Sequence, residues 1–178
     1  MRVISGKARG LKLTSPAGSD TRPTLDRVKE AIFSMLLPYL SGASVLDLFA
    51  GSGALGIEAL SRGADKAVFV DKSNEAVKCI KKNLTAAKVE DFSTVLMSSS
   101  ESYLMDCTEK FDIIFIDPPY AEGLYENILS LIEKYNILAE SGIIVVESDY
   151  DIGFTDRIGH FEILKEKKYG RVGITVLK

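Results

Sequence analysis

Five short runs rich in β-branched and aromatic residues alternate with helical segments, and this alternation constrains the fold of the 178-residue chain more than any other feature. The runs cover residues 44–49, 66–71, 93–97, 111–117 and 142–148. Strands that are separated by helices are joined by crossover connections, which make neighbouring strands parallel. The sequence therefore predicts an α/β fold with a mainly parallel sheet.

Apolar residues between these runs recur at the spacing of a helix with one buried face. We expect one helix over about residues 24–37, a second from Ser73 onward and a third over residues 124–135. Pro23 and Ser73 are of residue types that commonly begin helices. These helices would supply the crossovers of the parallel sheet.

The two ends of the chain do not follow this alternation of strands and helices. Residues 161–178 form two strand-like runs around Gly170, which predicts an antiparallel hairpin closing a seven-stranded sheet. Residues 2–13 also alternate and contain Gly6 and Gly10, so we expect a small hairpin there. We predict one compact domain, in which residues 1–40 form a basic hairpin and helix and residues 41–178 form the main α/β unit.

Composition excludes several classes of protein. The longest apolar runs are far shorter than the roughly 20 residues of a membrane-spanning helix. The chain has two cysteines and one histidine, too few for a structural zinc site, so we expect no metal. Its N-terminus lacks the apolar segment of a signal peptide. We therefore expect a cytoplasmic protein that makes no membrane contact.

Positive charge is concentrated at the start of the chain. Residues 1–30 carry a balance of +4, whereas the whole chain has a net charge of −3. A basic segment on an acidic body indicates an edge that contacts a polyanion. Ordinary solvated surface would give the same pattern, so both interpretations stand at this point.

The first strand-like run leads into a glycine-rich motif. It reads Asp47-Leu-Phe-Ala-Gly51-Ser-Gly53-Ala-Leu-Gly56 and opens a helix. Glycines permit a tight turn and let a ligand approach the backbone closely. Asp71 ends the next run, 20 residues after Gly51, where a carboxylate can hold a ribose diol. The pattern predicts a nucleoside cofactor without specifying which one.

Asp47 favours a cationic cofactor over a dinucleotide, because a carboxylate at the strand end repels a pyrophosphate. S-adenosylmethionine has no phosphate and carries an ammonium and a sulfonium, both of which a carboxylate attracts in a partly dry cleft. Two alternatives are open here. Asp47 could simply cap a neighbouring turn, and Phe49, a second candidate for cofactor contact, could simply pack in the core.

The sequence Asp117-Pro118-Pro119-Tyr120 directly follows another expected strand. Ligands of parallel sheets bind at the carboxyl ends of the strands. Methylation of a nucleobase amine is helped by acceptors for both N–H bonds, which the Asp117 carboxylate and the Pro118 carbonyl could supply. Tyr120 could stack on a base turned out of its helix. The alternative is an Asx-type turn with no catalytic role.

Together these motifs resemble the amino-methylating class I methyltransferases, which have a Rossmann-like fold. The segments Arg2 to Leu13 and Thr21 to Glu30 are similar to the RsmD family of bacterial 16S rRNA guanine-N2 methyltransferases. The similarity extends to Lys168–Val172, which resembles the closing hairpin of that family. The resemblance covers essentially the whole chain.

The resemblance implies that the cofactor is S-adenosylmethionine and that the substrate is 16S rRNA in the small ribosomal subunit or its precursor. The protein would act as a monomer. The implied cofactor-binding residues are Asp47, Phe49, Gly51, Gly53, Asp71, Ser99 and Glu101. The implied catalytic loop comprises Asp117, Pro118, Pro119 and Tyr120. We expect phosphate contacts from Arg2, Lys7, Arg9, Arg22 and Arg27.

Other interpretations share parts of this pattern. Arg22 to Thr24 could touch the cofactor instead of RNA, and Arg22 and Arg27 could pair with nearby acids. An adenine-N6 DNA or RNA methyltransferase shares both motifs, although the DNA enzymes usually carry a sizeable recognition domain. A nicotinamide-dependent oxidoreductase would explain the glycines and Asp71 only. A non-catalytic RNA-binding assembly factor would explain only the basic segment.

Overall fold

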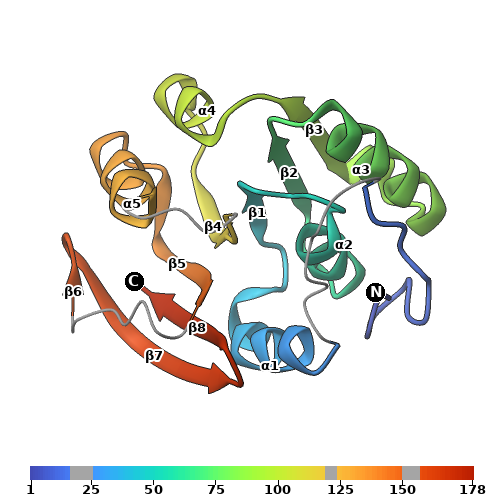
Figure 1. The fold of residues 1–178 in the computed structure, drawn as a ribbon, viewed down its shortest axis with the longest axis horizontal. Helices are drawn as coiled ribbons and strands as arrows, with labels where there is room; N and C mark the ends of the chain where they lie inside the picture. Colours follow the sequence, from blue (N-terminus) through green and yellow to red (C-terminus); the bar gives the residue numbers. More distant parts are fainter. Residues whose placement is uncertain (17–25, 119–123, 150–156) are drawn as a thin grey trace.

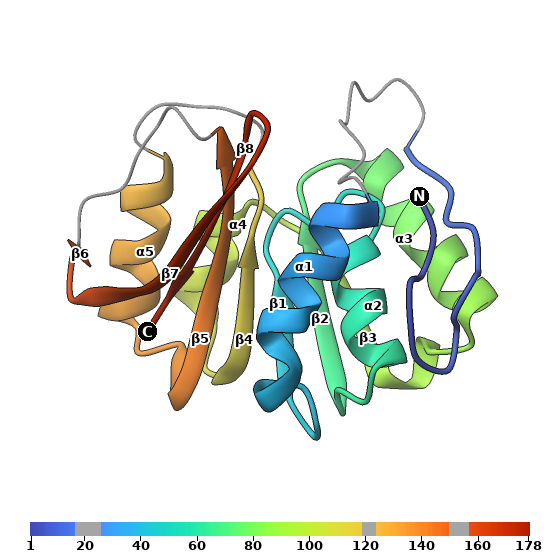
Figure 2. The same cartoon turned by 90° about the horizontal axis from the view of Figure 1, so that it is seen from below.

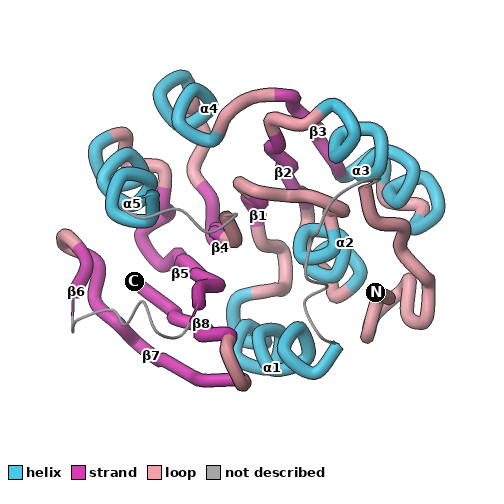
Figure 3. Tube along the Cα trace, viewed as in Figure 1, coloured by secondary structure: helices cyan, strands magenta, loops and turns pink. Residues whose placement is uncertain are grey.

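The computed structural model describes residues 1–16, 26–118, 124–149 and 157–178. Helices and strands alternate along most of this length (Figure 3). In chain order the elements are α1 (Asp26–Leu36), η1 (Leu37–Tyr39), β1 (Ser44–Asp47), α2 (Ala54–Ser61), β2 (Lys66–Asp71), α3 (Asn74–Ala87), η2 (Glu90–Phe92), β3 (Ser93–Met97), α4 (Ser100–Asp106), β4 (Phe111–Ile116), α5 (Leu124–Lys134), β5 (Leu138–Asp149), β6 (Arg157–Ile158), β7 (Phe161–Tyr169) and β8 (Val172–Leu177).

One twisted sheet runs through the molecule in the order β3-β2-β1-β4-β5-β8-β7-β6 (Figure 1). The strands from β3 to β5 are parallel, and β8 pairs antiparallel with β5 and with β7. The two-residue β6 extends the edge beyond the seven longer strands. This is the predicted Rossmann-like α/β fold, and the C-terminal hairpin around Gly170 is also confirmed.

Each face of the sheet packs into its own apolar core. One core joins the sheet to α1, α2 and α3, and the other joins it to α4 and α5 (Figures 1 and 2). Adjacent residues of β1 alternate between them, with Val45 in the first core and Leu46 in the second. Both residues are fully buried, as expected for a central parallel strand.

Several predicted boundaries shift. β1 ends at Asp47 instead of Phe49, because the chain there turns into the glycine-rich loop, where Gly51 has a φ of +53°. β5 begins at Leu138 instead of Gly142. Helix α4 was not predicted, because its seven residues are too few to show an apolar period. Ser73 is confirmed as the N-cap of α3, since its Oγ accepts from the Ala76 N–H at 3.4 Å.

Residues 1–16, which we call the N-terminal arm, run along α2 and α3 on one side of the sheet (Figure 2). A single antiparallel bridge joins Arg2 to Lys12, so the arm is a bridged loop where a regular hairpin was expected. Val3 and Leu13 bury their side chains in the first core. The longest helix in the described ranges is α3, with 14 residues, and none there combines the length and hydropathy of a membrane span.

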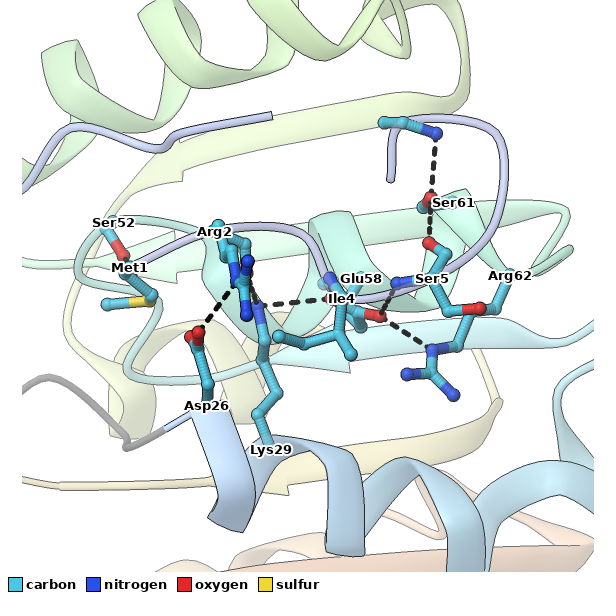
Figure 4. A network of polar contacts seen from close by, with 12 residues as sticks. Met1, Arg2, Ile4, Ser5, Asp26, Lys29, Ser52, Glu58, Ser61 and Arg62 are labelled. Atoms are coloured by element: carbon cyan, nitrogen blue, oxygen red, sulfur yellow. Dashed lines mark hydrogen bonds and ion pairs between the residues drawn. The ribbon is translucent and has the colours of Figure 1, made fainter. Parts of the chain in front are cut away.

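A buried ion-pair network attaches the arm to the helices (Figure 4). Glu58 in α2 is fully buried and lies 3.1 Å from the Lys29 ammonium and 2.7 Å from Nε of Arg62. Its two carboxylate oxygens also accept hydrogen bonds from the N–H groups of Ile4 and Ser5, at 2.7 and 3.0 Å. Lys29 donates a further hydrogen bond to the Arg2 carbonyl. Burial lowers the pKa of Lys29, and the adjacent Glu58 opposes that shift.

A close approach of two backbones completes the attachment. Gly6 has a φ of +82°, and a Cβ there would lie 1.8 Å from the Ser61 carbonyl oxygen. The hydroxyl of Ser61 donates to the Ser5 carbonyl at 2.6 Å and accepts from the Ala8 N–H at 3.0 Å. The arm therefore depends on glycine at position 6 to reach the end of α2.

The substitution Glu58→Gln should lower the free energy of unfolding by about 3–5 kcal/mol, because it leaves the buried Lys29 ammonium without a counter-charge. Denaturant unfolding at pH 7 measures this loss. Glu75→Gln is the matched control, since Glu75 pairs with Lys78 on the exposed surface of α3 at 3.1 Å. The control should change the free energy by less than about 1 kcal/mol. Equal losses in the two variants would contradict the account.

Candidate active site

The carboxyl ends of the parallel strands surround a cavity of about 620 Å³. Register places these ends side by side, because Asp47 at the end of β1 pairs with Phe69 of β2 and Phe115 of β4. The cavity is lined by loops that follow β1, β2, β3 and β4, by the end of β5 and by the N-terminal arm. The lining residues are Met1, Pro16, Asp47, Leu48, Phe49, Ala50, Gly51, Ser52, Ala54, Leu55, Asp71, Lys72, Ser73, Ala76, Ser98, Ser99, Ser100, Glu101, Asp117, Pro118, Leu124 and Glu147.

The glycine-rich loop between β1 and α2 forms one wall of the cavity. Its backbone is tied to the Val70 carbonyl through the Ala50 N–H at 3.1 Å. A Cβ on Gly51 would have only the Phe49 carbonyl oxygen as a neighbour, at 3.9 Å, so the space beside this backbone is open. At Gly56, by contrast, a Cβ would lie 2.3 Å from the Phe69 ring. The first glycine leaves room at the cavity wall, and the last lets α2 pack closely on β2.

Asp71 at the end of β2 holds the glycine-rich loop in place. One carboxylate oxygen accepts the Gly51 N–H at 2.8 Å, and the other accepts the Ser73 N–H at 2.8 Å. Each oxygen retains a lone pair that could accept a hydroxyl proton. The ribose contact predicted for Asp71 is therefore compatible with its geometry, and its role in shaping the loop is an additional finding.

Asp47 is only 2% exposed and accepts the Gly56 N–H at 3.2 Å through Oδ2. Burial raises the pKa of Asp47 to about 7, against the opposing effect of this hydrogen bond. The charges of Asp117 and Asp71 raise it further. Asp47 therefore caps the first turn of α2, as its alternative interpretation required. It also lines the cavity, where a bound cation would stabilise its ionised form.

Asp117 and Pro118 follow β4 and line the same cavity as the glycine-rich loop. Asp117 is partly buried, and burial raises its pKa to about 7. Near neutral pH this carboxyl group can therefore either accept a hydrogen bond or take up a proton. Pro119 and Tyr120, the other two residues of the expected catalytic loop, lie outside the described residues.

Ser99, Glu101 and Phe49 also line the cavity. Ser99 is the N-cap of α4, because its Oγ accepts the Ser102 N–H at 3.1 Å, so part of its hydrogen-bonding capacity serves the helix. Phe49 packs partly against the second core, as its alternative interpretation required, and exposes the rest. The structure thus brings together every described residue predicted to bind the cofactor except Gly53, which lies buried at the start of α2.

Sequence reasoning did not assign several lining residues to the site, among them Met1, Pro16, Leu124 and Glu147. Glu147 could have been found, because it lies near the carboxyl end of an expected parallel strand. The two residues from the N-terminal arm could not, since nothing in the local sequence indicates that the arm reaches across to this edge.

The predicted RNA-binding residues fall into two groups along the N-terminal arm and α1. Arg2 pairs with Asp26 at 2.8 Å near the start of α1, and the exposed Arg27 follows on the same helix. Lys7 donates its backbone N–H to the Ser61 carbonyl, at the end of α2 away from the cavity. The exposed Arg9 lies in the same turn, and Arg22 is outside the described residues. These four described residues therefore do not form one cluster.

The whole sequence, residues 1–178, matches the family described as conserved hypothetical protein 95. It is 38% identical over 172 residues to the ribosomal RNA small subunit methyltransferase D of Escherichia coli, covering 97% of this chain and 86% of that protein. It is 41% identical over 181 residues to YlbH of Bacillus subtilis, whose name marks it as a candidate rRNA methyltransferase, covering 100% of this chain and 98% of that protein.

Solved structures show the same architecture. The chain superposes on a candidate methyltransferase of Escherichia coli with a TM-score of 0.89 and 35% identity, covering 99% of this chain and 96% of the other. A candidate methylase of Haemophilus influenzae gives a TM-score of 0.83 and 36% identity, covering 99% and 97%. The likeness therefore extends over the full sheet and its helices.

Asp47→Asn should stabilise the protein at pH 8 and have little effect at pH 4.5. The folded-state pKa of about 7 lies above the ordinary value of 3.8. The folded state thus retains a proton that the unfolded state has lost, and stability falls as pH rises between these two values. Asparagine can still accept the Gly56 N–H through its Oδ1 and carries no charge.

Denaturant unfolding of both proteins at pH 4.5 and pH 8 measures the difference. Asp91→Asn, which changes an exposed carboxylate in η2, is the control and should show no such gain. If Asp47→Asn were less stable than the parent at pH 8, the proposed cost of burying this charge would be wrong.

Proposed function

This chain belongs to the RsmD family, and from that membership we propose that it transfers a methyl group from S-adenosylmethionine to the exocyclic N2 amine of a guanine in 16S rRNA. The substrate would be the small ribosomal subunit or its precursor, and the name of the Escherichia coli relative, which refers to small-subunit rRNA, supports this class of target. The choice of guanine over adenine rests on the family resemblance of the sequence. We expect the protein to act as a monomer.

The observation that best supports this proposal is the shared cavity. The glycine-rich loop and the Asp117-Pro118 segment come from different strands, yet both line one space of about 620 Å³. A volume of this size fits a drug-sized ligand. A cofactor beside the glycine-rich loop and a base beside Asp117 would therefore meet within a single cavity.

The chemistry of the cavity fits a cationic nucleoside. Asp47, Asp71, Glu101, Asp117 and Glu147 line it, and Lys72 is the one cationic side chain among the described lining residues. Burial has raised the pKa of both Asp47 and Asp117 to about 7. A positive charge nearby would favour their ionised forms, whereas a pyrophosphate would be repelled. The bound cofactor supplies a methyl group made electrophilic by the adjacent sulfonium.

Asp117 and Pro118 are assigned to the nucleobase. A carboxylate oxygen of Asp117 accepts one N–H of the amine and the Pro118 carbonyl oxygen accepts the other, which directs the nitrogen lone pair away from the base ring. The nitrogen would gain a bond to the methyl carbon as the sulfur–methyl bond of the cofactor breaks and leaves a neutral thioether, and the nitrogen would lose one proton. With a pKa of about 7, Asp117 can hold that proton before it passes to solvent.

Incubation with methyl-labelled S-adenosylmethionine tests the function directly. Small subunits, naked 16S rRNA and duplex DNA serve as parallel substrates, and the labelled nucleoside is identified after digestion. We expect label in N2-methylguanosine from 16S rRNA. Label in N6-methyladenine would favour the adenine-N6 alternative, and binding of rRNA with no labelling of any substrate would favour the assembly-factor alternative.

Asp117→Ala should lower the single-turnover methylation rate by about tenfold to more than a hundredfold, because a buried acceptor is lost in the transition state. Cofactor affinity, measured by calorimetry, should fall much less than the rate, since Asp117 bonds to the base and acts on the cofactor only through its charge. Glu140→Ala, an exposed acid of β5 away from the cavity, is the control. An unchanged rate in Asp117→Ala would remove the assigned role.

Two pairs of substitutions test the expected phosphate contacts. One variant combines Arg2→Gln with Arg27→Gln, near the start of α1. The other combines Lys7→Gln with Arg9→Gln, in the turn of the arm beside Ser61. Each variant removes two positive charges. Removal of one phosphate contact should reduce the slope of log affinity for rRNA against log salt by about 0.7–0.9. We expect the larger reduction from the first pair, which lies nearer the cavity. Unchanged slopes in both pairs would mean that this surface does not contact RNA.

A further inference from the structure

Asn83 of α3 is a buried amide that neither sequence motif includes. It is 2% exposed, and its side chain makes four hydrogen bonds of 2.8–2.9 Å to residues from two distant segments. An asparagine side chain has two N–H donors and two acceptor lone pairs. Every one of these groups is thus paired, so the amide is held by both segments and holds both in turn.

The donors and the acceptor of the amide engage different groups. Nδ2 donates to the Ser52 carbonyl at 2.8 Å and to the Thr14 carbonyl at 2.9 Å. Oδ1 accepts the Thr14 N–H and the Thr14 hydroxyl, both at 2.9 Å. The reversed orientation of the amide would place its oxygen against two carbonyl oxygens, so this network fixes the orientation shown.

The two partners belong to two segments that both contribute to the cavity lining. Ser52 lies between Gly51 and Gly53 in the glycine-rich loop, where positive φ angles leave the backbone without regular secondary-structure bonds. Thr14 lies two residues before Pro16, through which the N-terminal arm contributes to the cavity lining. Asn83 itself does not line the cavity, so it can act on a bound molecule only through these two segments.

We propose that Asn83 is a positioning residue for the cofactor site, which holds the Ser52 carbonyl of the glycine-rich loop and ties that loop to Thr14 of the N-terminal arm. This inference rests on the proposed function, since it assigns S-adenosylmethionine as the ligand of the loop. The hydrogen bond between the Asp71 carboxylate and the Gly51 N–H fixes the loop from one side, and Asn83 fixes it from the other.

The arrangement also links the arm to the cofactor. Because one side chain holds both segments, displacement of the arm removes three of the four bonds that orient the Asn83 amide. The arm carries part of the basic surface expected to meet rRNA. Asn83 therefore holds both the glycine-rich loop, which faces the cofactor, and the N-terminal arm, which faces the substrate.

Calorimetric titration with S-adenosylmethionine tests this role at a temperature well below unfolding. Asn83→Ala should weaken cofactor binding about tenfold, as loss of a buried hydrogen bond with its partner left unpaired predicts. Asn83→Asp keeps the shape and the acceptor for Thr14 but sets a carboxylate against the two carbonyls, and it should weaken binding at least as much. This second variant provides the test if the alanine variant does not fold.

Two controls separate positioning from general stability. Leu84→Ala removes the neighbouring buried side chain of α3 and should lower Tm without changing cofactor affinity. Thr14→Val removes one of the two bonds to Oδ1, leaves the bond to Ser52 intact and should change affinity by less than about threefold. In steady-state assays, Asn83→Ala should raise KM for the cofactor more than it lowers kcat.

Each outcome either supports or overturns the positioning role of Asn83. Weaker binding in the Asn83 variants with unchanged binding in Leu84→Ala supports the positioning role. Unchanged binding in the Asn83 variants, or equal weakening in Leu84→Ala, would overturn it while leaving the proposed function intact. If the parent protein itself does not bind S-adenosylmethionine, the proposed function is wrong and the inference falls with it.

Discussion

The convergence of like-charged carboxylates at the ends of parallel strands is the constraint on which the rest of the site depends. Asp47, Asp71 and Asp117 end or follow β1, β2 and β4, and strand register brings these ends to one edge. Backbone N–H groups of Gly51, Ser73 and Gly56 partly stabilise two of these acids. The residual cost of burial appears as the raised pKa values of Asp47 and Asp117, which a bound cation would relieve.

The N-terminal arm is part of this site although it lies far from it in sequence. It reaches the cavity because two buried polar side chains hold it, Glu58 through backbone donors of Ile4 and Ser5 and Asn83 through Thr14. Such groups are stable in the interior only when their polar atoms are paired. Glu58 lies on α2 and Asn83 lies on α3, the helices that flank the glycine-rich loop. The same two helices therefore hold the arm and the loop.

Most of the fold could be predicted from the sequence, because strand and helix periods alternate cleanly and glycines mark the turns. The glycine-rich loop, Asp71 and Asp117 could be placed for the same reason, since the carboxyl ends of parallel strands meet at one edge. Helix α4 escaped prediction because it is too short to show a period. The loop residues Pro119 and Tyr120 remain predictions.

Interactions between distant segments could not be predicted. The pairing of Lys29 with Glu58 joins α1 to α2, and nothing in either helix sequence indicates that these charged residues are fully buried. In the sequence, Asn83 is one of several polar residues of an amphipathic helix. Its burial becomes apparent only when the arm is packed against the helix. The basic residues of the arm are close together in sequence, yet the turn at Gly6 carries Lys7 away from the cavity.

The protons released on cofactor binding at pH 7 provide the most direct test of the central claim, that buried acids receive a cation. Calorimetric titrations in buffers of different ionisation enthalpy measure this number for S-adenosylmethionine and for S-adenosylhomocysteine, which lacks the sulfonium charge. The account predicts proton release with the first ligand, as the pKa values of Asp47 and Asp117 fall from about 7, and clearly less with the second. Equal release with both ligands, or none with either, would contradict it.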